Sequence, residues 1–503
     1  MQNGYAVIPT TIASDQITNG DHSLSPSDYC KLSIKNKNTV PLRKLVTNPI
    51  HGGKEVGSKE YISKSTHFFI RTKCLSADSF LLDYESDGLV PIRPQAFKEQ
   101  NLKAGDILIS KDSNIGETAI LNQDHSNFMV SGGIKILKIQ QEPYYVYSIL
   151  KHKFFKQQLE LLTKRGATLK HAKAKYLDCE IPFPNQSNSQ EVIEYVSLLV
   201  KAVMRKEAKI VENASKINEL IVKELVENQL DRTFTYVQPT QKEIEKTYRL
   251  DASIYSEDYK KKIFLIENYI YGTDNIYGWG FNLSRGQNLQ VSNIGKSIYS
   301  EERKENYYKL FLPTYLTVFG TVSKVMYLGN KNKLKCLEKG DIIFGAEGFE
   351  KGRSIVIPDE VSNTITNIHG ITLKTEDHDL TKSIFVRCFL NFLRGEGLID
   401  KYAVGGNGGS LSIKYWTAIK LPKFPKPKQE EIAKYYHNSC AIDSSNFGLK
   451  NFETKDETLT NEQGIIQLDA QIKAIKNKLS SIIDSIIANK TVSIDFGFYK
   501  TPT

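Results

Sequence analysis

Asp106 and Asp341 stand in two copies of one short motif, and repeated carboxylates are candidates for metal-dependent nuclease chemistry. The motif reads Leu-x-x-Gly-Asp-Ile-x-x over 102–109 and again over 337–344. A nuclease centre gathers carboxylates and a lysine around a divalent ion, but neither aspartate is followed by Glu-x-Lys. Glu207 and Lys209 have that spacing on a helical stretch, where they are typical of a solvated face. We expect the two aspartates to accept hydrogen bonds from their own turns, and we predict no catalytic residue.

Methyl-transfer and metal-binding machinery are also missing. The sequence has no Pro-Pro pair to place an exocyclic amine beside a methyl donor, and no donor-binding glycine-rich turn follows a first strand. Gly405–Gly409 is dense in glycine, but no Lys-Ser or Lys-Thr follows it to hold phosphate and metal, so a flexible turn is favoured. The nine histidines are scattered without metal-ligand spacing. We therefore predict no metal site and no cofactor held by this chain.

DNA contact is the favoured chemistry. Residues 164–171, Lys-Arg-Gly-Ala-Thr-Leu-Lys-His, form a basic loop before a strand, and 405–414 occupy the matching place later in the chain. Phosphates attract such loops, and Arg, Lys, Asn and Gln can contact base edges. Each residue taken singly is more simply an exposed polar side chain, whereas the two matching loops together indicate DNA. The candidate DNA-binding residues are Arg93, Gln95, Lys111, Asn114, Lys164, Arg165, Thr168, Lys170, His171, Arg285, Gln287, Asn288, Asn293, Lys351, Arg353, Asn407, Ser410, Ser412, Lys414 and Tyr415.

Length and composition set the class of protein. With 503 residues the chain exceeds a single core and fits two to four domains. Its net charge of +10 permits a polyanionic partner without requiring one. No apolar run is long enough to cross a bilayer, and the N-terminus does not resemble a signal peptide. The six cysteines are widely spaced without a C-x-x-C pair, which favours free thiols in a reducing cytoplasm.

Two long heptad stretches must position these loops. The first runs from Ser189, the expected cap, to about Gln229 without Pro or Gly, and only Glu207 interrupts its apolar seam. We expect the two seams to pack against each other as antiparallel helices, although self-association is the ordinary alternative. For Glu207 we consider a contact to a partner subunit, a register marker, or a side chain that reaches water. The seam residues are Ile193, Val196, Val200, Val203, Ile210, Ile217 and Ile221 in the first stretch, and Ile465, Leu468, Ile472, Ile475, Leu479, Ile482 and Ile486 in the second.

The sequence between and before these stretches is duplicated in character. The Gly-Asp motif, an alternating strand (131–138 and 368–373), a helix (144–162 and 384–393) and an extended Pro-containing segment (181–184 and 421–425) recur in the same order. This predicts an α+β protein with two mixed α/β recognition modules, joined and spaced by two antiparallel coiled-coil helices. The expected divisions are a polar lead-in over 1–40, modules over 41–187 and 231–426, a first spacer helix over 188–230, and a helical region over 427–503 with an inserted loop (438–461) and a second spacer helix (462–490).

The ordered motifs resemble the specificity subunit of type I restriction–modification systems over nearly the whole chain. The resemblance rests on 102–117, on Ile181-Pro-Phe-Pro184 before a long helix, on Arg249-Leu-Asp-Ala-Ser-Ile-Tyr255, and on Leu421-Pro422 running into Gln429-Glu-Glu-Ile-Ala433. The first copy departs from the family at Ser113, where a Gly often follows the Lys-Asp turn.

The resemblance implies two target-recognition domains, each binding one half of a split site on double-stranded DNA. It implies two methyltransferase subunits as partners, which methylate adenine at N6, and restriction/translocase subunits that cleave unmodified foreign DNA in a defence system. S-adenosylmethionine, ATP and magnesium would be used by those partners. The alternatives are a self-sufficient methyltransferase or nuclease, and a coiled-coil adaptor whose modules bind proteins.

Overall fold

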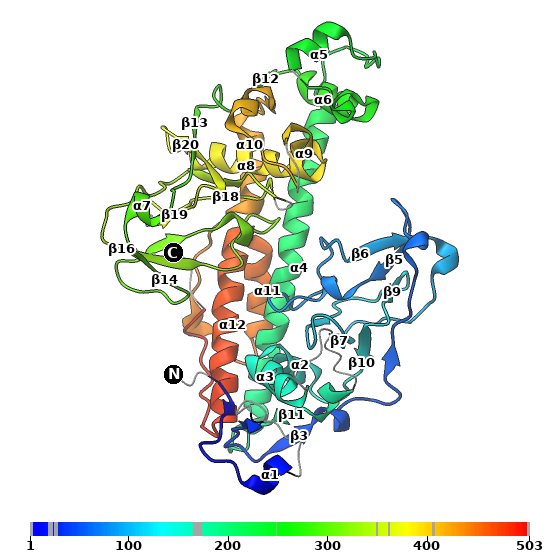
Figure 1. Cartoon of the computed structure of the whole chain (residues 1–503), viewed down its shortest axis with the longest axis vertical. Helices are drawn as coiled ribbons and strands as arrows, with labels where there is room; N and C mark the ends of the chain where they lie inside the picture. Colours follow the sequence, from blue (N-terminus) through cyan, green and yellow to red (C-terminus); the bar gives the residue numbers. More distant parts are fainter. Residues whose placement is uncertain are drawn as a thin grey trace. The chain divides into compact units, whose positions relative to one another are not determined.

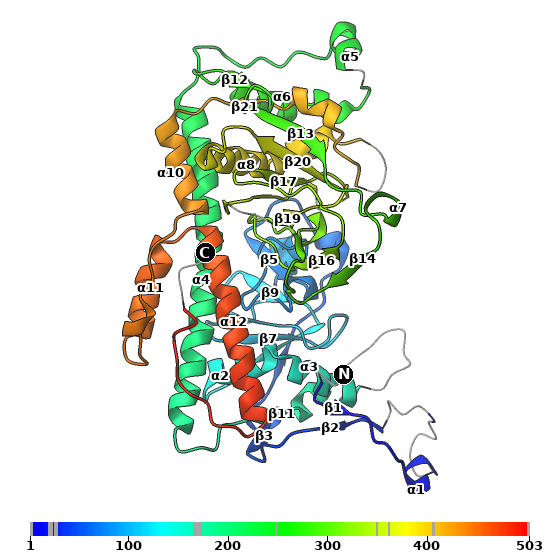
Figure 2. The same cartoon turned by 90° about the vertical axis from the view of Figure 1, so that its left-hand side faces the viewer.

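The computed structural model describes residues 4–18, 24, 29–163, 174–247, 249–348, 351–360, 363–404 and 408–499. Helices and sheets are mixed along the chain, as an α+β fold requires (Figures 1 and 2). The chain divides into two compact units. Unit 1 consists of Met1–Ala208, Ala441–Asn461 and Ala470–Lys500, and unit 2 consists of Lys209–Cys440, Glu462–Asp469 and Thr501–Thr503.

Unit 1 contains a four-stranded sheet in the order β4-β10-β7-β8 and a three-stranded sheet in the order β6-β5-β9. All neighbours are antiparallel except β5 and β9, which run parallel. The short pairs β1-β2 and β11-β3 complete its strands. The bounds are β1 Ala6–Val7, α1 Ser14–Thr18, β2 Lys31–Leu32, β3 Thr39–Pro41, β4 His51–Gly52, β5 His67–Ile70, β6 Leu89–Ile92, β7 Ile107–Ser110, β8 Thr118–Ile120, β9 Phe128–Val130, β10 Ile134–Leu137, α2 Pro143–Lys151, α3 Lys153–Leu162 and β11 Glu180–Pro182.

Unit 2 contains two four-stranded sheets, in the orders β13-β20-β17-β18 and β14-β16-β15-β19, and the pair β12-β21. Among the described strand pairs of unit 2, only β15 and β19 run parallel. The bounds are α5 Gln241–Thr247, α6 Glu257–Glu267, β12 Thr273–Asp274, β13 Phe281–Arg285, α7 Val291–Ile294, β14 Ser297–Ser300, β15 Tyr308–Leu310, β16 Met326–Asn330, β17 Ile342–Gly345, β18 Ser354–Val356, β19 Thr364–Ile365, β20 Gly370–Thr375, α8 Leu380–Gly395, α9 Leu398–Tyr402, β21 Leu421–Pro422 and α10 Lys426–Tyr436.

Strand register relates positions in one unit to positions in the other. The first strand residue after the Gly-Asp turn is Ile107 in unit 1, where it pairs with Ile120, and Ile342 in unit 2, where it pairs with Val356. Two residues earlier in β8 and β18 lie Thr118 and Ser354, so these two residues occupy the same place in their sheets. Apolar side chains that alternate along the strands fill a core against each sheet.

The helix predicted over 144–162 is divided in two by His152. The backbone of His152 is extended, and the Nδ1 of His152 accepts the Phe154 N–H at 3.3 Å. His152 is therefore the N-cap of α3. An imidazole acceptor thus supplies the cap that Ser, Thr or Asn usually provides. The sequence pattern missed the break because apolar residues continue on both sides of it.

The long helix α4 is Ser189–Glu227, and α12 is Ile465–Ile487. Every apolar seam residue named above is buried, and Ala214, which has the same heptad spacing in the first seam, is half-buried. Within unit 1 the two helices run antiparallel, since Asn188 Nδ2 donates to the Val492 carbonyl at 3.0 Å while Glu207 contacts Lys476. The capping role expected of Ser189 is wrong, because α4 begins at that residue and its Oγ donates to the Gln186 carbonyl.

Glu207, the charged residue of the seam, connects three elements of unit 1. Its Oε2 accepts the backbone N–H groups of Phe80 at 2.8 Å and Leu81 at 2.9 Å, and the Ser79 hydroxyl at 3.2 Å. Its Oε1 lies 2.7 Å from Lys476 Nζ on α12. With its side chain 13% exposed, Glu207 does not extend into water but joins the 79–81 segment to both long helices.

The inserted segment 438–461 is not the loop that its Ser, Asn, Thr and Asp content predicts, because its second half forms helix α11, Phe452–Glu462. Phe452, Asp456 and Thr460 are buried at helical spacing. Lys206 Nζ donates to Asp456 Oδ1 at 2.6 Å and to Thr460 Oγ1 at 2.7 Å. A buried ion pair therefore joins this helix to α4, in addition to the apolar contact between Phe452 and Phe496.

Candidate nucleic-acid interface

The Gly-Asp turns before β7 and β17 support the strands that carry the candidate residues. Asp106 Oδ2 accepts the Lys103 N–H at 3.0 Å, and Asp341 Oδ2 accepts the Glu338 N–H at 3.0 Å. Burial raises the pKa of Asp341. The prediction that these aspartates accept hydrogen bonds from their own turns is confirmed.

In unit 1, Lys111 and Asn114 lie on the turn between β7 and β8. The Lys111 N–H donates to the Gly133 carbonyl at 2.9 Å, and the Asn114 carbonyl accepts the Glu117 N–H at 3.0 Å. Lys111 Nζ lies 3.3 Å from Asp112 Oδ2, and both side chains are more than a quarter exposed. The turn thus holds an amide and an ammonium group at the surface on a fixed backbone.

Lys135, which the sequence analysis did not single out, lies beside Lys111. It belongs to β10, and a Cβ added at Gly52 on the neighbouring strand would come within 2.6 Å of its Nζ. Both lysines line a hollow of about 400 Å³ together with Ile50, Ala174, Tyr176 and Leu177. The hollow is lined mainly by apolar residues, and its two lysines supply the positive charge that attracts phosphate.

Arg93 and Gln95 are exposed at the other end of the β6-β5-β9 sheet. Arg93 follows β6, whose last residue pairs with the first residue of β5. The turn that contacts Lys111 follows β9, where the Ser131 N–H donates to the Ile70 carbonyl at the end of β5. These two candidates therefore do not join the surface formed by Lys111 and Lys135.

In unit 2, Arg285 belongs to an exposed charged cluster with Glu347 and His369. Arg285 Nη1 lies 3.3 Å from Glu347 Oε1, and His369 Nδ1 lies 2.6 Å from Glu347 Oε2. Their side chains are 34%, 39% and 59% exposed. A guanidinium, a carboxylate and an imidazole thus stand together at the ends of β13 and β17, and these are side chains that pair with base edges.

Gln287 lies next to this cluster, and Asn288 and Asn293 follow it. The Gln287 N–H donates to the Thr366 carbonyl at 2.8 Å, and its Nε2 donates to the Lys335 carbonyl at 2.8 Å. Asn288 Oδ1 accepts the Gln290 N–H at 3.2 Å. Asn293 is exposed on α7. Gln287 is therefore held as part of the scaffold, and Asn293 remains accessible.

Lys351 and Arg353 are engaged with the protein itself. Lys351 is 8% exposed, and its Nζ lies 2.6 Å from Asp400 Oδ1 and donates to the Gly408 carbonyl at 2.5 Å. Arg353 Nη1 donates to the Leu316 carbonyl at 3.1 Å. Both cations therefore bind backbone carbonyls of their own unit.

Ser410 contacts the same cluster through a β-bridge to Glu347. Ser412 precedes the 3-10 helix Ile413–Ala418, and the exposed Lys414 Nζ lies 4.9 Å from the centre of the Tyr415 ring. Lys164, Arg165, Thr168, Lys170, His171 and Asn407 lie outside the described residues.

The residues that the sequence analysis missed stand where the two copies differ. The His369 carbonyl accepts the N–H of Ala346, the residue after β17, and the Gly133 carbonyl accepts the N–H of Lys111, the residue after β7. His369 and Gly133 therefore occupy equivalent positions in the two copies. Glu347 and Asp112 follow one position later. Aligning the two copies residue by residue would have found them, because the scaffold is shared and the side chains at this edge are not.

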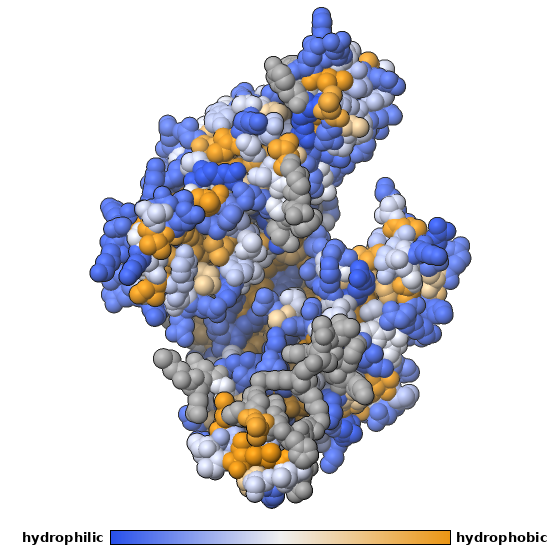
Figure 3. All heavy atoms as spheres, in the orientation of Figure 1, coloured by the Kyte–Doolittle hydropathy of each residue, from blue (hydrophilic) through white to orange (hydrophobic). Residues whose placement is uncertain are grey.

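The described residues contain no group of three or more His, Cys, Asp or Glu side chains placed to hold a metal ion. Among these residues, no helix combines the length and apolar character needed to cross a membrane. The face in Figure 3 is mostly hydrophilic, with apolar residues in small groups.

The chain is similar to solved proteins of type I restriction–modification systems. One is the S subunit from M. genitalium, with 15% identity, a TM-score of 0.41, and coverage of 92% of this chain and 98% of that one. A second comes from a structural study of assembly and conformational transition in the type I system (11%, TM-score 0.28, 92% and 100%). A third is the HsdS subunit from Thermoanaerobacter tengcongensis (14%, TM-score 0.27, 90% and 97%). No protein-family model and no curated protein matches the sequence.

Proposed function

We propose that this chain is a non-catalytic DNA-binding subunit that recognises a bipartite site, with one half-site bound by each unit. The observation that carries the proposal is the shared sheet order, β4-β10-β7-β8 and β13-β20-β17-β18, with different polar side chains at the same edge. Recognition of two different half-site sequences requires two similar scaffolds that carry different side chains at the DNA-contacting edge. In one half, Lys111 and Lys135 would bind phosphates and the exposed Asn114 would contact bases. In the other half, Arg285 with Glu347 and His369 would contact bases.

The two long helices would set the distance between the half-sites. At 1.5 Å per residue, one heptad is about 10 Å, or about three base pairs at 3.4 Å each. Removing one heptad from both helices should therefore shorten the unspecified spacer by about three pairs. The heptad removed should not be 203–209. That heptad contains Lys206, which binds Asp456 of α11, and Glu207, which accepts the Phe80 N–H.

Catalysis would come from partners. Two methyltransferase subunits would methylate adenine at N6 with S-adenosylmethionine, and restriction/translocase subunits would use ATP and magnesium. Recognition of target DNA by this chain would direct them to their sites in defence against foreign DNA.

Binding of the purified chain to a pool of random-sequence duplexes tests the proposal. Affinity should fall steeply between 50 and 200 mM salt, because each phosphate contact adds about 0.9 to the slope. Replacing Lys111, Lys135 and Arg285 by Met should weaken binding and flatten the slope. Lys216→Met is the matched control, since Lys216 is 45% exposed on α4 and pairs only with Glu219 among the described residues.

Two outcomes would support other functions. Unchanged affinity with a flat salt dependence would favour a protein-binding adaptor. Methyl transfer or cleavage by the purified chain alone, given S-adenosylmethionine and magnesium, would favour a self-sufficient enzyme.

A further inference from the structure

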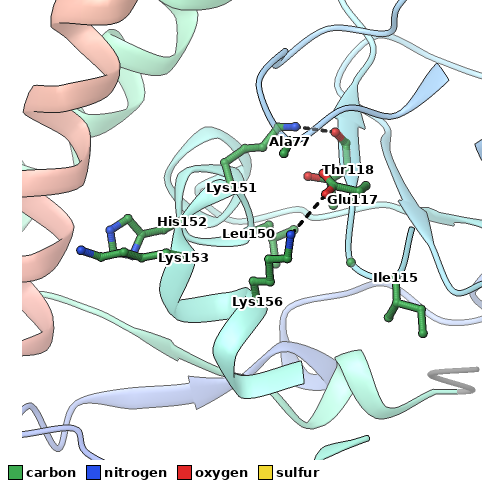
Figure 4. Close-up of a pocket in the computed structure, with 10 residues that line it drawn as sticks. Ala77, Ile115, Glu117, Thr118, Leu150, Lys151, His152, Lys153 and Lys156 are labelled. Atoms are coloured by element: carbon green, nitrogen blue, oxygen red, sulfur yellow. Dashed lines mark hydrogen bonds and ion pairs between the residues drawn. The ribbon is translucent and has the colours of Figure 1, made fainter. Parts of the chain in front are cut away.

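In each unit, a cationic side chain from a helix donates a hydrogen bond to the equivalent strand of the repeated sheet. The helix is α2 in unit 1 and α8 in unit 2. In unit 1, Lys151 ends α2, and its Nζ donates to the Ser76 and Thr118 carbonyls, each at 2.6 Å. Figure 4 shows Lys151 reaching the Thr118 carbonyl beside a cavity of about 60 Å³. Burial lowers the pKa of Lys151 to about 8, which leaves the ammonium form in the majority at pH 7.

In unit 2, Arg387 makes the corresponding contacts from α8. Its Nε donates to the Ser354 carbonyl at 3.1 Å, and its Nη2 donates to the Val318 carbonyl at 3.2 Å. Arg387 is 2% exposed. Because strand register equates Ser354 with Thr118, the two cations bind the same carbonyl of the repeated sheet.

Aromatic rings surround both cations. Lys151 Nζ lies 5.9 Å from the centre of the Tyr147 ring, and Arg387 Cζ lies 4.8 Å from that of Tyr436. Gly320 is needed at its position, since its φ is +82° and a Cβ there would lie 2.4 Å from the Arg387 guanidinium. In each unit the cation therefore contacts backbone carbonyls and an aromatic ring, and in unit 2 the absence of a side chain at Gly320 leaves room for it.

The bound carbonyl directly follows the proposed DNA-contacting turn. Thr118 begins β8, after the turn that carries Lys111 and Asn114. Ser354 begins β18 and follows the segment 346–353, of which residues 346–348 and 351–353 are described and which begins with Ala346 and Glu347. A cation that fixes this carbonyl fixes one end of the turn, while β7 or β17 fixes the other.

We propose that Lys151 and Arg387 are equivalent positioning residues, each of which holds the DNA-contacting turn of its own unit in the conformation that binds one half-site. This inference rests on the proposed function. It assigns a role in DNA sequence specificity to two residues that do not contact DNA. It predicts that a substitution of either residue changes the half-site of its own unit alone.

Selection of duplexes from a random-sequence pool tests the inference with the full-length chain. Lys151→Met should remove discrimination in one half of the selected motif, and Arg387→Met in the other, each by about ten- to a hundredfold. Lys151→Arg and Arg387→Lys keep a cation and should restore the affected half. Lys153→Met is the control, since Lys153 neighbours Lys151 but is 53% exposed and pairs with Asp484.

The outcomes separate this inference from the proposed function. A wild-type chain that selects no motif contradicts the proposed function itself. A wild-type split motif that both Met variants retain, or that each variant degrades equally in both halves, overturns the positioning role. Where a Met variant fails to fold, Lys151→Gln or Arg387→Gln, which also removes the cation, takes its place and is judged by the same outcomes.

Discussion

Replacing Glu207 by Ala should destabilise unit 1 by about 3 kcal/mol. The substitution removes the acceptor of the Phe80 and Leu81 N–H groups and the partner of Lys476. An unsatisfied buried N–H costs about 1–3 kcal/mol, and the lower end applies because Glu207 and Lys476 keep 13% and 26% exposure. Two such groups at about 1 kcal/mol each and about 1 kcal/mol for the ion pair give the total. In a unit of this size the melting temperature should fall by about 6–12 °C.

The assay can separate the units, because both tryptophans, Trp279 and Trp416, belong to unit 2. Circular dichroism follows both units and tryptophan fluorescence follows unit 2, so Glu207→Ala should shift the dichroism transition more than the fluorescence transition. Glu207→Gln keeps an acceptor for the N–H groups and should cost about 1 kcal/mol. Glu212→Ala, which breaks a pair in which Glu212 is 68% exposed, should cost less than about 0.5 kcal/mol. If Glu207→Ala costs no more than Glu212→Ala, the anchoring role of Glu207 is refuted.

Three further predictions concern unit 1. Asp456→Ala should cost about 3–5 kcal/mol in urea unfolding, because it leaves Lys206, itself 0% exposed, without its carboxylate; a loss no larger than that of Glu453→Ala, whose side chain is 47% exposed, would contradict this. Burial lowers the pKa of His152 to about 3, so the unfolded chain binds more protons than the folded one between that pH and 6.5. The free energy of unfolding should therefore fall as pH drops below 6.5, by up to about 1.4 kcal/mol per pH unit. His152→Asn keeps a cap acceptor and should reduce this pH dependence between pH 6.5 and 5. An unchanged pH dependence in the variant would exclude His152 as its source. Ser113 has a φ of 62°, so Ser113→Gly should stabilise the chain by about 0.5–1 kcal/mol, and a lower melting temperature would show that the serine side chain contributes bonds of its own.

Local and periodic features could be predicted from sequence. The seam residues are buried because heptad spacing alone places them on one face. Asp106 and Asp341 bond their turns because the partner N–H lies only three residues away. Both outcomes depend on neighbours in sequence, which a single chain displays directly.

Contacts between distant segments could not be predicted. Arg285, Glu347 and His369 come from three separate segments, and their pairing follows from the register of β13, β20 and β17. Lys351 has the charge of a phosphate contact, but it is buried and pairs with Asp400 of α9. The charged residues of the sequence therefore predict the candidate DNA-binding surface only in part, because the fold determines which cations remain exposed.

The most direct test of the central claim is the motif that the purified full-length chain selects from random-sequence duplexes. A bipartite reader should select two short specified blocks separated by an unspecified spacer of fixed length, and Arg285→Met should change one block alone. Selection of a single contiguous motif, or of no motif at all, would contradict it.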